Sequence, residues 1–268
     1  MSASVTTYDV PPLADRGSRW WRSHLGGRLM REVLVVAGLY SLYKLGRTLS
    51  RNEVGAAFAH AQDVLSFERF FGIANERSLQ LLVLDHRWLV MLLNRYYATV
   101  HFPLSIGFLV FTYVRHPGVY PRIRWLFGLT TASALVIHVL YPLAPPRLLP
   151  GYVDTITHYG PRIYSNAAVT SQANQFAAMP SLHFAWAALV AYGIIRCGPQ
   201  RWRRLAVAHP LMTLVAIVLT ANHFWLDAIV GGLLAVGAGL VHKWVVAVTS
   251  GPSIRAAFGG GATPDPLG

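Results

Sequence analysis

Apolar residues along this 268-residue chain are collected into discrete blocks separated by short polar stretches. Five blocks cover residues 96–114, 125–142, 181–196, 205–221 and 225–247. None of them has a charged residue in its middle, where one would cost about 2.5–3.5 kcal/mol in a bilayer. The pattern therefore predicts an all-α fold, a polytopic bundle of membrane helices.

A sixth block, residues 33–49, is less regular. Its apolar part ends near Tyr43 and is short for a bilayer, which needs about 20 residues of helix. It reaches that length only if Lys44 and Arg47 extend their charges to the interface. Counting this block gives about six transmembrane helices.

Residues 50–94 mix apolar and charged positions. Val54 and Leu65 fall on one face of a regular helix, which predicts amphipathic helices lying at the membrane interface. A soluble cap is the alternative for this region.

Taken as a whole, the pattern divides the chain into a basic cytosolic segment (1–30), a membrane catalytic domain (31–248) and a flexible tail (249–268).

Composition agrees with a membrane location, since 54% of the residues are hydrophobic and 13% charged, whereas soluble domains carry about 25% charged residues. A net charge of +12 can indicate nucleic-acid binding. Here, however, the arginines lie between apolar blocks, as in loops that face anionic lipids. We therefore expect lipids, and not nucleic acid, as partners. The single cysteine, Cys197, excludes an internal disulfide.

The arginines also predict an orientation. Loops 115–124 and 197–204 contain three arginines each, whereas 143–180 contains two and 222–224 none. The positive-inside bias puts the first two loops in the cytoplasm, so the other two face outward. We expect a plasma-membrane protein with both termini cytoplasmic and its active site on the extracytoplasmic face.

Three short segments lie at the predicted outer ends of the spans, where they would meet on one membrane face. They are Ala-Pro-Pro-Arg at 144–147, Met-Pro-Ser-Leu-His at 179–183, and Asn-His-Phe-Trp-Leu-Asp at 222–227. Each alone also fits an ordinary helix end or an interfacial side chain. Their joint occurrence on one face indicates a functional site.

The chemistry of these segments points to phosphoryl transfer. His223 and Asp227 are neighbours on a helix, and the carboxylate would fix the imidazole tautomer and leave the other nitrogen free to attack. Pro180 suits the first helical turn, so that Ser181 and His183 would lie where backbone N–H groups favour an anion. The guanidinium of Arg147 matches the geometry of a phosphate.

Together the three segments resemble the type 2 phosphatidic acid phosphatase (PAP2) superfamily. The longer stretches 141–147, 179–186 and 222–228, and 68–76 ahead of them, are similar to its inositolphosphotransferase branch, which includes inositol phosphorylceramide synthases. The resemblance covers roughly residues 30–247. It implies a six-helix bundle that works through a covalent phosphohistidine, without a metal or another cofactor.

The resemblance also implies residue roles. His223 would be the nucleophile, Asp227 its orienting partner and His183 the general acid and base, with Arg147 and Ser181 as phosphate ligands. A further set of four residues is a candidate for the head-group pocket, although His101 also fits a packed interfacial histidine. This set comprises His101, Tyr97, Arg162 and Asn222.

Two departures from the superfamily pattern bear on the substrate. The lysine seven residues before the arginine is replaced by Leu140, and the Ser-Arg pair before the histidine by Ala216 and Ile217. Losing cations weakens a dianionic phosphomonoester more than a monoanionic diester, although Arg162 could restore one charge. The sequence therefore favours a lipid phosphotransferase that moves a phospho-head group, such as phosphoinositol, to an alcohol. A phosphatase that hydrolyses a lipid phosphomonoester or pyrophosphate is the alternative.

Two other classes of protein, a zinc enzyme and a transporter, fit the sequence less well. His183, His223 and Asp227 could in principle bind zinc, but the sequence has no His-Glu-x-x-His helix and no cysteine pair. A transporter would have polar residues in the middle of its spans, and the predicted spans have almost none.

Overall fold

The computed structural model describes residues 30–35, 37–38, 41, 53–160 and 175–249. The chain divides into two compact units, Met1–Lys44 and Leu45–Gly268. In the first unit the described residues are helical. Most of the 33–49 block lies outside the described residues, so the sixth span, and with it the count of about six, stays a prediction.

In the second unit the described residues form helices and no strand. In chain order they are α2 (Val54–Phe70), α3 (Glu76–Leu84), α4 (Arg87–Arg95), the π-helical turn η2 (Tyr96–Val100), α5 (His101–Arg115), α6 (Tyr120–Leu140), the 3₁₀ turn η3 (Pro146–Leu148), α7 (Thr155–Tyr159), α9 (Leu182–Cys197), α10 (Gln200–Ala206), α11 (Ala208–Leu219) and α12 (Trp225–Thr249). The all-α class predicted from the pattern is confirmed for this part of the chain.

Within the described residues, four helical stretches are long and apolar enough to cross a membrane: Arg87–Arg115, Tyr120–Leu140, Gln200–Leu219 and Trp225–Thr249. The remaining predicted span, residues 181–196, forms α9, an apolar helix of 16 residues, which is shorter than the others. The first stretch begins at Arg87 instead of residue 96, because α4 runs through η2 into α5 without a break. The protein is therefore an integral membrane protein.

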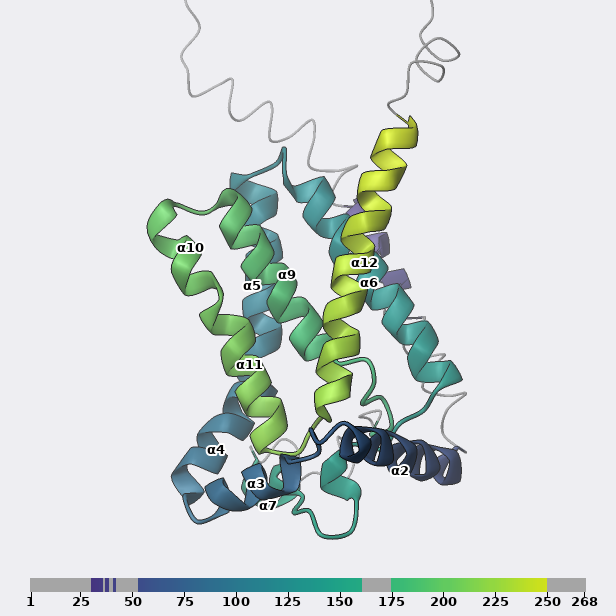
Figure 1. Cartoon of the computed structure of the whole chain (residues 1–268). Helices are drawn as coiled ribbons and strands as arrows, with labels where there is room; N and C mark the ends of the chain where they lie inside the picture. Colours follow the sequence, from purple (N-terminus) through teal and green to yellow (C-terminus); the bar gives the residue numbers. More distant parts are fainter. Residues whose placement is uncertain (1–29, 36, 39–40, 42–52, 161–174, 250–268) are drawn as a thin grey trace, which may run out of the picture. The chain divides into compact units, whose positions relative to one another are not determined.

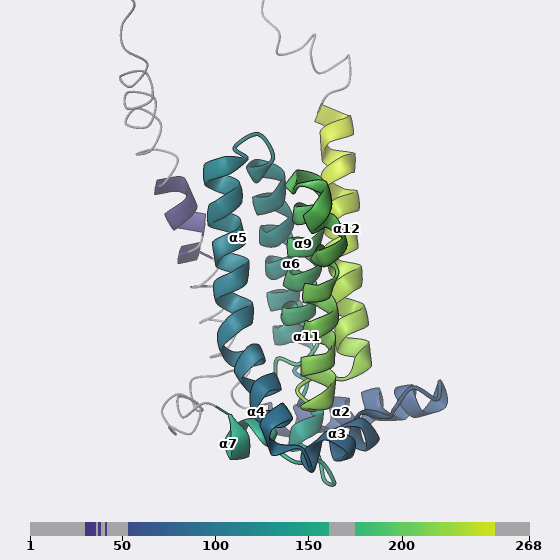
Figure 2. The same cartoon turned by 90° about the vertical axis from the view of Figure 1, so that its left-hand side faces the viewer.

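Helices α5, α6, α9, α11 and α12 run side by side (Figures 1 and 2), and α9 contacts each of the other four. Helices α2, α3 and α7 lie at one end of this bundle. The same end holds the end of α6 and the beginnings of α9 and α12, whereas the opposite end holds the loops after α5 and α9.

The bundle presents apolar side chains to its surroundings as well as to its core. Along α12, for example, Leu233 and Leu240 are 63% and 60% exposed. A face of this kind is suited to contact with lipid acyl chains.

Helix α2, at one end of the bundle, ends at Phe70. Gly72 follows with a φ of 70°, a left-handed conformation that favours glycine. The interfacial position predicted for residues 50–94 stays a prediction.

Candidate active site

The three polar segments meet at the end of the bundle that carries α2, α3 and α7. The Arg147 N–H donates to the Ala221 carbonyl at 2.8 Å, and the Ser181 N–H donates to the Asp227 carbonyl at 2.9 Å. Leu143, just ahead of the first segment, forms a parallel bridge with Ala177, just ahead of the second. Backbone hydrogen bonds therefore join the three segments, either directly or through the residues just ahead of them.

His223 and Asp227 form a buried pair. The His223 Nδ1 atom lies 3.2 Å from Asp227 Oδ2, which also accepts the Phe224 N–H at 3.0 Å. His223 precedes α12 instead of lying on a helix with Asp227, as the spacing had suggested. The reason is that Ala221 takes a φ of 54° after α11, which turns the chain and brings the imidazole back over the first turn of α12.

The environment of His223 favours its neutral form. Burial lowers the pKa of His223 to about 4; the Ala178 backbone carbonyl opposes this shift and the Arg147 guanidinium adds to it. A neutral imidazole has a nitrogen lone pair available for attack. The surroundings of His223 are therefore compatible with a nucleophile at neutral pH.

Ser181 caps α9, its Oγ accepting the Phe184 N–H at 3.4 Å. Pro180 therefore lies before the cap, and not in the first helical turn as predicted, because the helix begins only at Leu182. His183 lies in that first turn, and its ring centre is 5.8 Å from that of His223. The two imidazoles therefore lie close together where the three segments meet.

The beginning of α9 and the beginning of α12 approach each other closely at Gly231. A Cβ atom at this position would lie 2.4 Å from the Ser181 carbonyl oxygen, a distance that no side chain tolerates. The missing side chain lets the segment of Ser181 and His183 lie against that of Asp227. Gly231 was not predicted from the sequence, because its role depends on a contact between distant segments.

Arg147 already has an anionic partner in the protein. Its Nη1 atom lies 3.0 Å from Asp154 Oδ1, while its buried Nε atom has no hydrogen-bond partner among the described residues. Asp154 also caps α7, accepting hydrogen bonds from the N–H and hydroxyl of Thr157. Asp154 was not predicted from the sequence, although it is the one acidic residue between positions 86 and 226.

Two buried glutamates hold the beginning of α12. Glu68 Oε1 accepts the Leu226 N–H at 2.8 Å, and Glu76 Oε1 accepts the Trp225 N–H at 3.3 Å. These are N–H groups that a helix leaves without a partner at its start. Burial, together with the neighbouring Glu76 carboxyl group, raises the pKa of Glu68 to about 9. From the sequence, residues 68–76 stood out only through the resemblance, and two glutamates in an aromatic stretch were the available signal.

Of the four candidate head-group residues, Tyr97 and His101 lie beside His183. Tyr97 stacks on His183 with ring centres 4.2 Å apart, and the His101 ring lies 4.8 Å from His183. His101 is buried, and neither ring nitrogen has a partner among the described residues. The Asn222 amide donates to the Thr220 hydroxyl at 2.6 Å. Arg162 lies outside the described residues.

The positions that depart from the superfamily pattern have ordinary structural surroundings. Leu140 is 75% exposed at the end of α6, and Ala216 and Ile217 are fully buried. The Ile217 carbonyl accepts the N–H groups of Asn222 and His223. Ile217 therefore shapes the turn that carries His223 but adds no charge.

The zinc hypothesis has no ligand set in the part of the chain that the structure describes. Within it, no group of three or more histidine, cysteine, aspartate or glutamate side chains is arranged to hold a metal ion. His183 and His223 lie close together, but with Asp227 they do not form such a group.

Comparison with known proteins identifies the family. The PAP2 superfamily model matches residues 62–241, more than half of the chain. This stretch contains all three polar segments and both glutamates that hold α12. No curated protein and no solved structure matches the chain. Members of the superfamily are phosphatases and phosphotransferases that act on lipid phosphates. This chain belongs to the PAP2 superfamily and is an enzyme of that class.

Proposed function

We propose that this protein is a lipid phosphotransferase that moves a phospho-head group, such as phosphoinositol, from a phospholipid to an alcohol through a phosphohistidine at His223. The observation that carries the proposal is the buried His223–Asp227 pair facing His183 across 5.8 Å. The Asp227 carboxylate orients the imidazole of His223. The imidazole of His183 does not belong to this pair and is close enough to exchange a proton with the same substrate.

In the first step the Nε2 atom of His223 attacks the phosphorus of the donor lipid. A P–N bond forms, and the bond between phosphorus and the diacylglycerol oxygen breaks. His183 gives its proton to that oxygen, so that diacylglycerol leaves as a neutral alcohol. Arg147 and Ser181 stabilise the charge on the equatorial oxygens, and Asp227 holds the Nδ1 proton of His223.

In the second step the acceptor hydroxyl gives its proton to His183 and attacks the phosphorus. The P–N bond breaks, which restores His223 and leaves the phospho-head group on the acceptor. Water in place of the alcohol would give hydrolysis. That is the alternative function, a lipid phosphate phosphatase acting on a phosphomonoester or pyrophosphate.

The charge of the site favours a diester donor. The three positions at which the superfamily pattern has Lys, Ser and Arg are Leu140, Ala216 and Ile217, and Arg147 faces Asp154 at 3.0 Å. Asp154 offsets part of the positive charge that a phosphate would meet. A diester carries one negative charge, whereas a monoester carries nearly two, so the diester is affected less by this reduced charge.

The proposed location is the plasma membrane, with the site on the extracytoplasmic face and both termini in the cytoplasm. Support comes from the arginines of the loops 115–124 and 197–204, which lie at the opposite end of the bundle from the site and would face the cytoplasm. Tyr97 and His101, beside His183, are the proposed head-group contacts, with Asn222 and Arg162 as further candidates.

The experiment offers purified protein a panel of labelled phospholipids and lipid monophosphates, with and without an alcohol acceptor. We expect head-group transfer from a diester to the alcohol, and loss of transfer in His223→Ala. His242→Ala, the same change towards the other end of α12, serves as the matched control and should retain activity. Release of free phosphate from monoesters, without any transfer, would contradict the transferase and favour the phosphatase.

A chelator separates this mechanism from a zinc-dependent one. We expect activity to persist after prolonged treatment with excess EDTA, because the proposed nucleophile and acid are imidazoles. Loss of activity that added zinc restores would contradict the metal-independent mechanism.

A further inference from the structure

A hollow of about 450 Å³ lies between α6, α9 and α12. Its lining includes Arg122 near the beginning of α6, Arg196 near the end of α9 and Lys243 towards the end of α12. The candidate active site lies at the other ends of the same three helices. The hollow is therefore a separate feature at the arginine-rich end of the bundle, and we refer to it as the basic groove.

The walls of the basic groove are apolar. Leu126 and Leu189 line it from α6 and α9, and Val236 and Leu240 line it from α12. Val236 and Leu240 are 61% and 60% exposed, so the α12 wall faces the surrounding lipid. An acyl chain can therefore enter the groove sideways from the bilayer.

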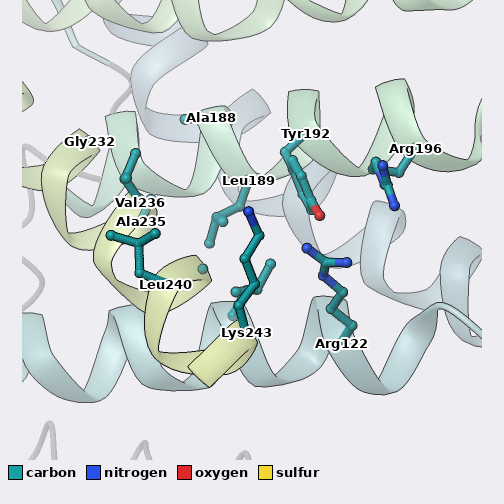
Figure 3. A pocket seen from close by; sticks show the side chains of 12 residues that line it. Arg122, Ala188, Leu189, Tyr192, Arg196, Gly232, Ala235, Val236, Leu240 and Lys243 are labelled. Carbon is teal, nitrogen blue, oxygen red and sulfur yellow. The ribbon is translucent and has the colours of Figure 1, made fainter. Parts of the chain in front are cut away.

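The mouth of the groove carries one cation from each helix. Figure 3 shows Tyr192 and Arg196 extending from α9 towards Arg122 of α6, with the Lys243 side chain beside them. The Arg122 guanidinium lies 5.5 Å from the centre of the Tyr192 ring. Its Nε atom is buried and has no hydrogen-bond partner among the described residues. A buried guanidinium N–H without an acceptor is unfavourable, and an anion in the groove would supply one.

The chain itself supplies little compensating charge in this region. Between positions 86 and 264 the sequence has two acidic residues, Asp154 and Asp227, and both belong to the candidate active site. In the described part of the chain no ion pair involves Arg122, Arg196 or Lys243. The three cations around the basic groove therefore have no acidic partner in this part of the chain, and an external anion would supply one.

We propose that the basic groove binds an anionic phospholipid from the leaflet at the arginine-rich end of the bundle. Arg122, Arg196 and Lys243 contact the head-group phosphate, and one acyl chain lies between α9 and α12. A guanidinium pair suits phosphate oxygens, and basic pockets between membrane helices suit anionic lipids. The apolar walls favour a lipid over a soluble anion. This lipid is bound and not converted, since the proposed nucleophile lies at the other end of the bundle.

The charged half of the proposal is tested by native mass spectrometry of purified protein released from vesicles of phosphatidylglycerol and phosphatidylcholine. The groove variant combines Arg122→Gln, Arg196→Gln and Lys243→Gln. The matched control combines Arg201→Gln, Arg203→Gln and Arg204→Gln, which removes the same charge from exposed positions on the adjacent α10. We expect retained phosphatidylglycerol to fall about tenfold in the groove variant, as for lost charged contacts, and to be unchanged in the control.

The apolar half is tested on two glycines of α12. A Cβ atom at either Gly237 or Gly239 would meet nothing within 4 Å, but only Gly239 lines the groove. Gly239→Leu should therefore fill the groove and reduce lipid retention without disturbing the fold, whereas Gly237→Leu should not. This pair also serves if the triple charge variant does not fold.

Three results would overturn the proposal. The first is equal retention of phosphatidylglycerol in the groove variants and their controls. The second is equal retention of phosphatidylcholine and phosphatidylglycerol by the wild-type protein. The third is binding of glycerol 3-phosphate in solution as tightly as phosphatidylglycerol, which would identify a plain anion site.

Discussion

The two ends of the bundle differ in how their ionisable side chains are buried and paired. At the candidate active site, acidic side chains are buried and held by hydrogen bonds: Asp227 accepts the Phe224 N–H, and Glu68 accepts the Leu226 N–H. At the basic groove, Arg196 and Lys243 are exposed and have no acidic partner in the described part of the chain. The same helices, α9 and α12, contribute to both ends.

This difference has a physical interpretation. Buried, hydrogen-bonded groups are preorganised, which is what a site needs in order to stabilise charge that develops during a reaction. Exposed cations beside an apolar surface can adapt to a lipid head group and are easily replaced. We therefore expect substitutions at the first end to affect catalysis strongly, and matched substitutions at the second end to leave catalysis almost unchanged.

The largest expected effect is that of Asp227→Asn. An amide cannot hold the His223 tautomer as a carboxylate does, so kcat should fall about 10³-fold or more. Steady-state kinetics in detergent micelles or vesicles provide the measurement. The control is Arg196→Gln at the basic groove, which should keep wild-type kcat. An Asp227→Asn enzyme as active as that control would contradict the proposed role.

The next effect compares two glycines on α12. Gly231→Ala would place a methyl group against the Ser181 carbonyl, so it should destabilise the protein by about 1–3 kcal/mol and reduce kcat by displacing His183. Gly237→Ala has open space and should be neutral or stabilising by up to about 1 kcal/mol. Thermal unfolding and kinetics of both variants are compared. Similar behaviour of the two would show that the approach of α9 to α12 at Gly231 is unimportant.

The third prediction concerns pH. Because the pKa of Glu68 rises from 4.5 to about 9 in the folded protein, folding favours the protonated form. The stability this gives is full below pH 4.5 and is lost as the pH rises through about 9, by up to about 1.4 kcal/mol per pH unit. Wild-type melting temperature should therefore fall over this range. Glu68→Gln, which stays neutral and still accepts the Leu226 N–H, should show a flatter profile; an equally steep one would contradict the assignment.

The smallest effect is that of Asp154→Asn. The substitution removes the carboxylate that pairs with Arg147 but can still cap α7, since asparagine is a good N-cap residue. A partly exposed ion pair is worth at most about 1 kcal/mol, so inhibition by inorganic phosphate should tighten by up to about fivefold. The measurement is an inhibition constant, with Thr157→Val as a control that alters the cap alone. Weaker inhibition in Asp154→Asn would show that Asp154 assists anion binding instead of opposing it.

The sequence predicted those features that depend on local pattern. Apolar blocks without central charges identified the membrane helices, and three short motifs identified segments that do meet at one end of the bundle. Spacing alone could not show that His223 lies in a turn, because the turn depends on the left-handed conformation of Ala221. Nor could it show that Pro180 lies ahead of the helix cap.

Residues whose roles depend on contacts between distant segments were not predictable in the same way. Glu68 and Glu76 lie more than a hundred positions before the helix they hold, and Gly231 matters only because Ser181 lies against it. Asp154 stood out by charge alone, yet nothing local linked it to Arg147. The basic groove likewise appears only when α6, α9 and α12 are brought together.

The most direct test of the central claim is to trap the covalent intermediate. Enzyme is mixed with a donor phospholipid carrying ³²P, quenched in alkali, digested and mapped. We predict label that is stable in base and released by acid, on the peptide containing His223, and absent from His223→Ala. No protein-bound label during turnover, or label that persists in His223→Ala, would contradict a phosphohistidine at this position.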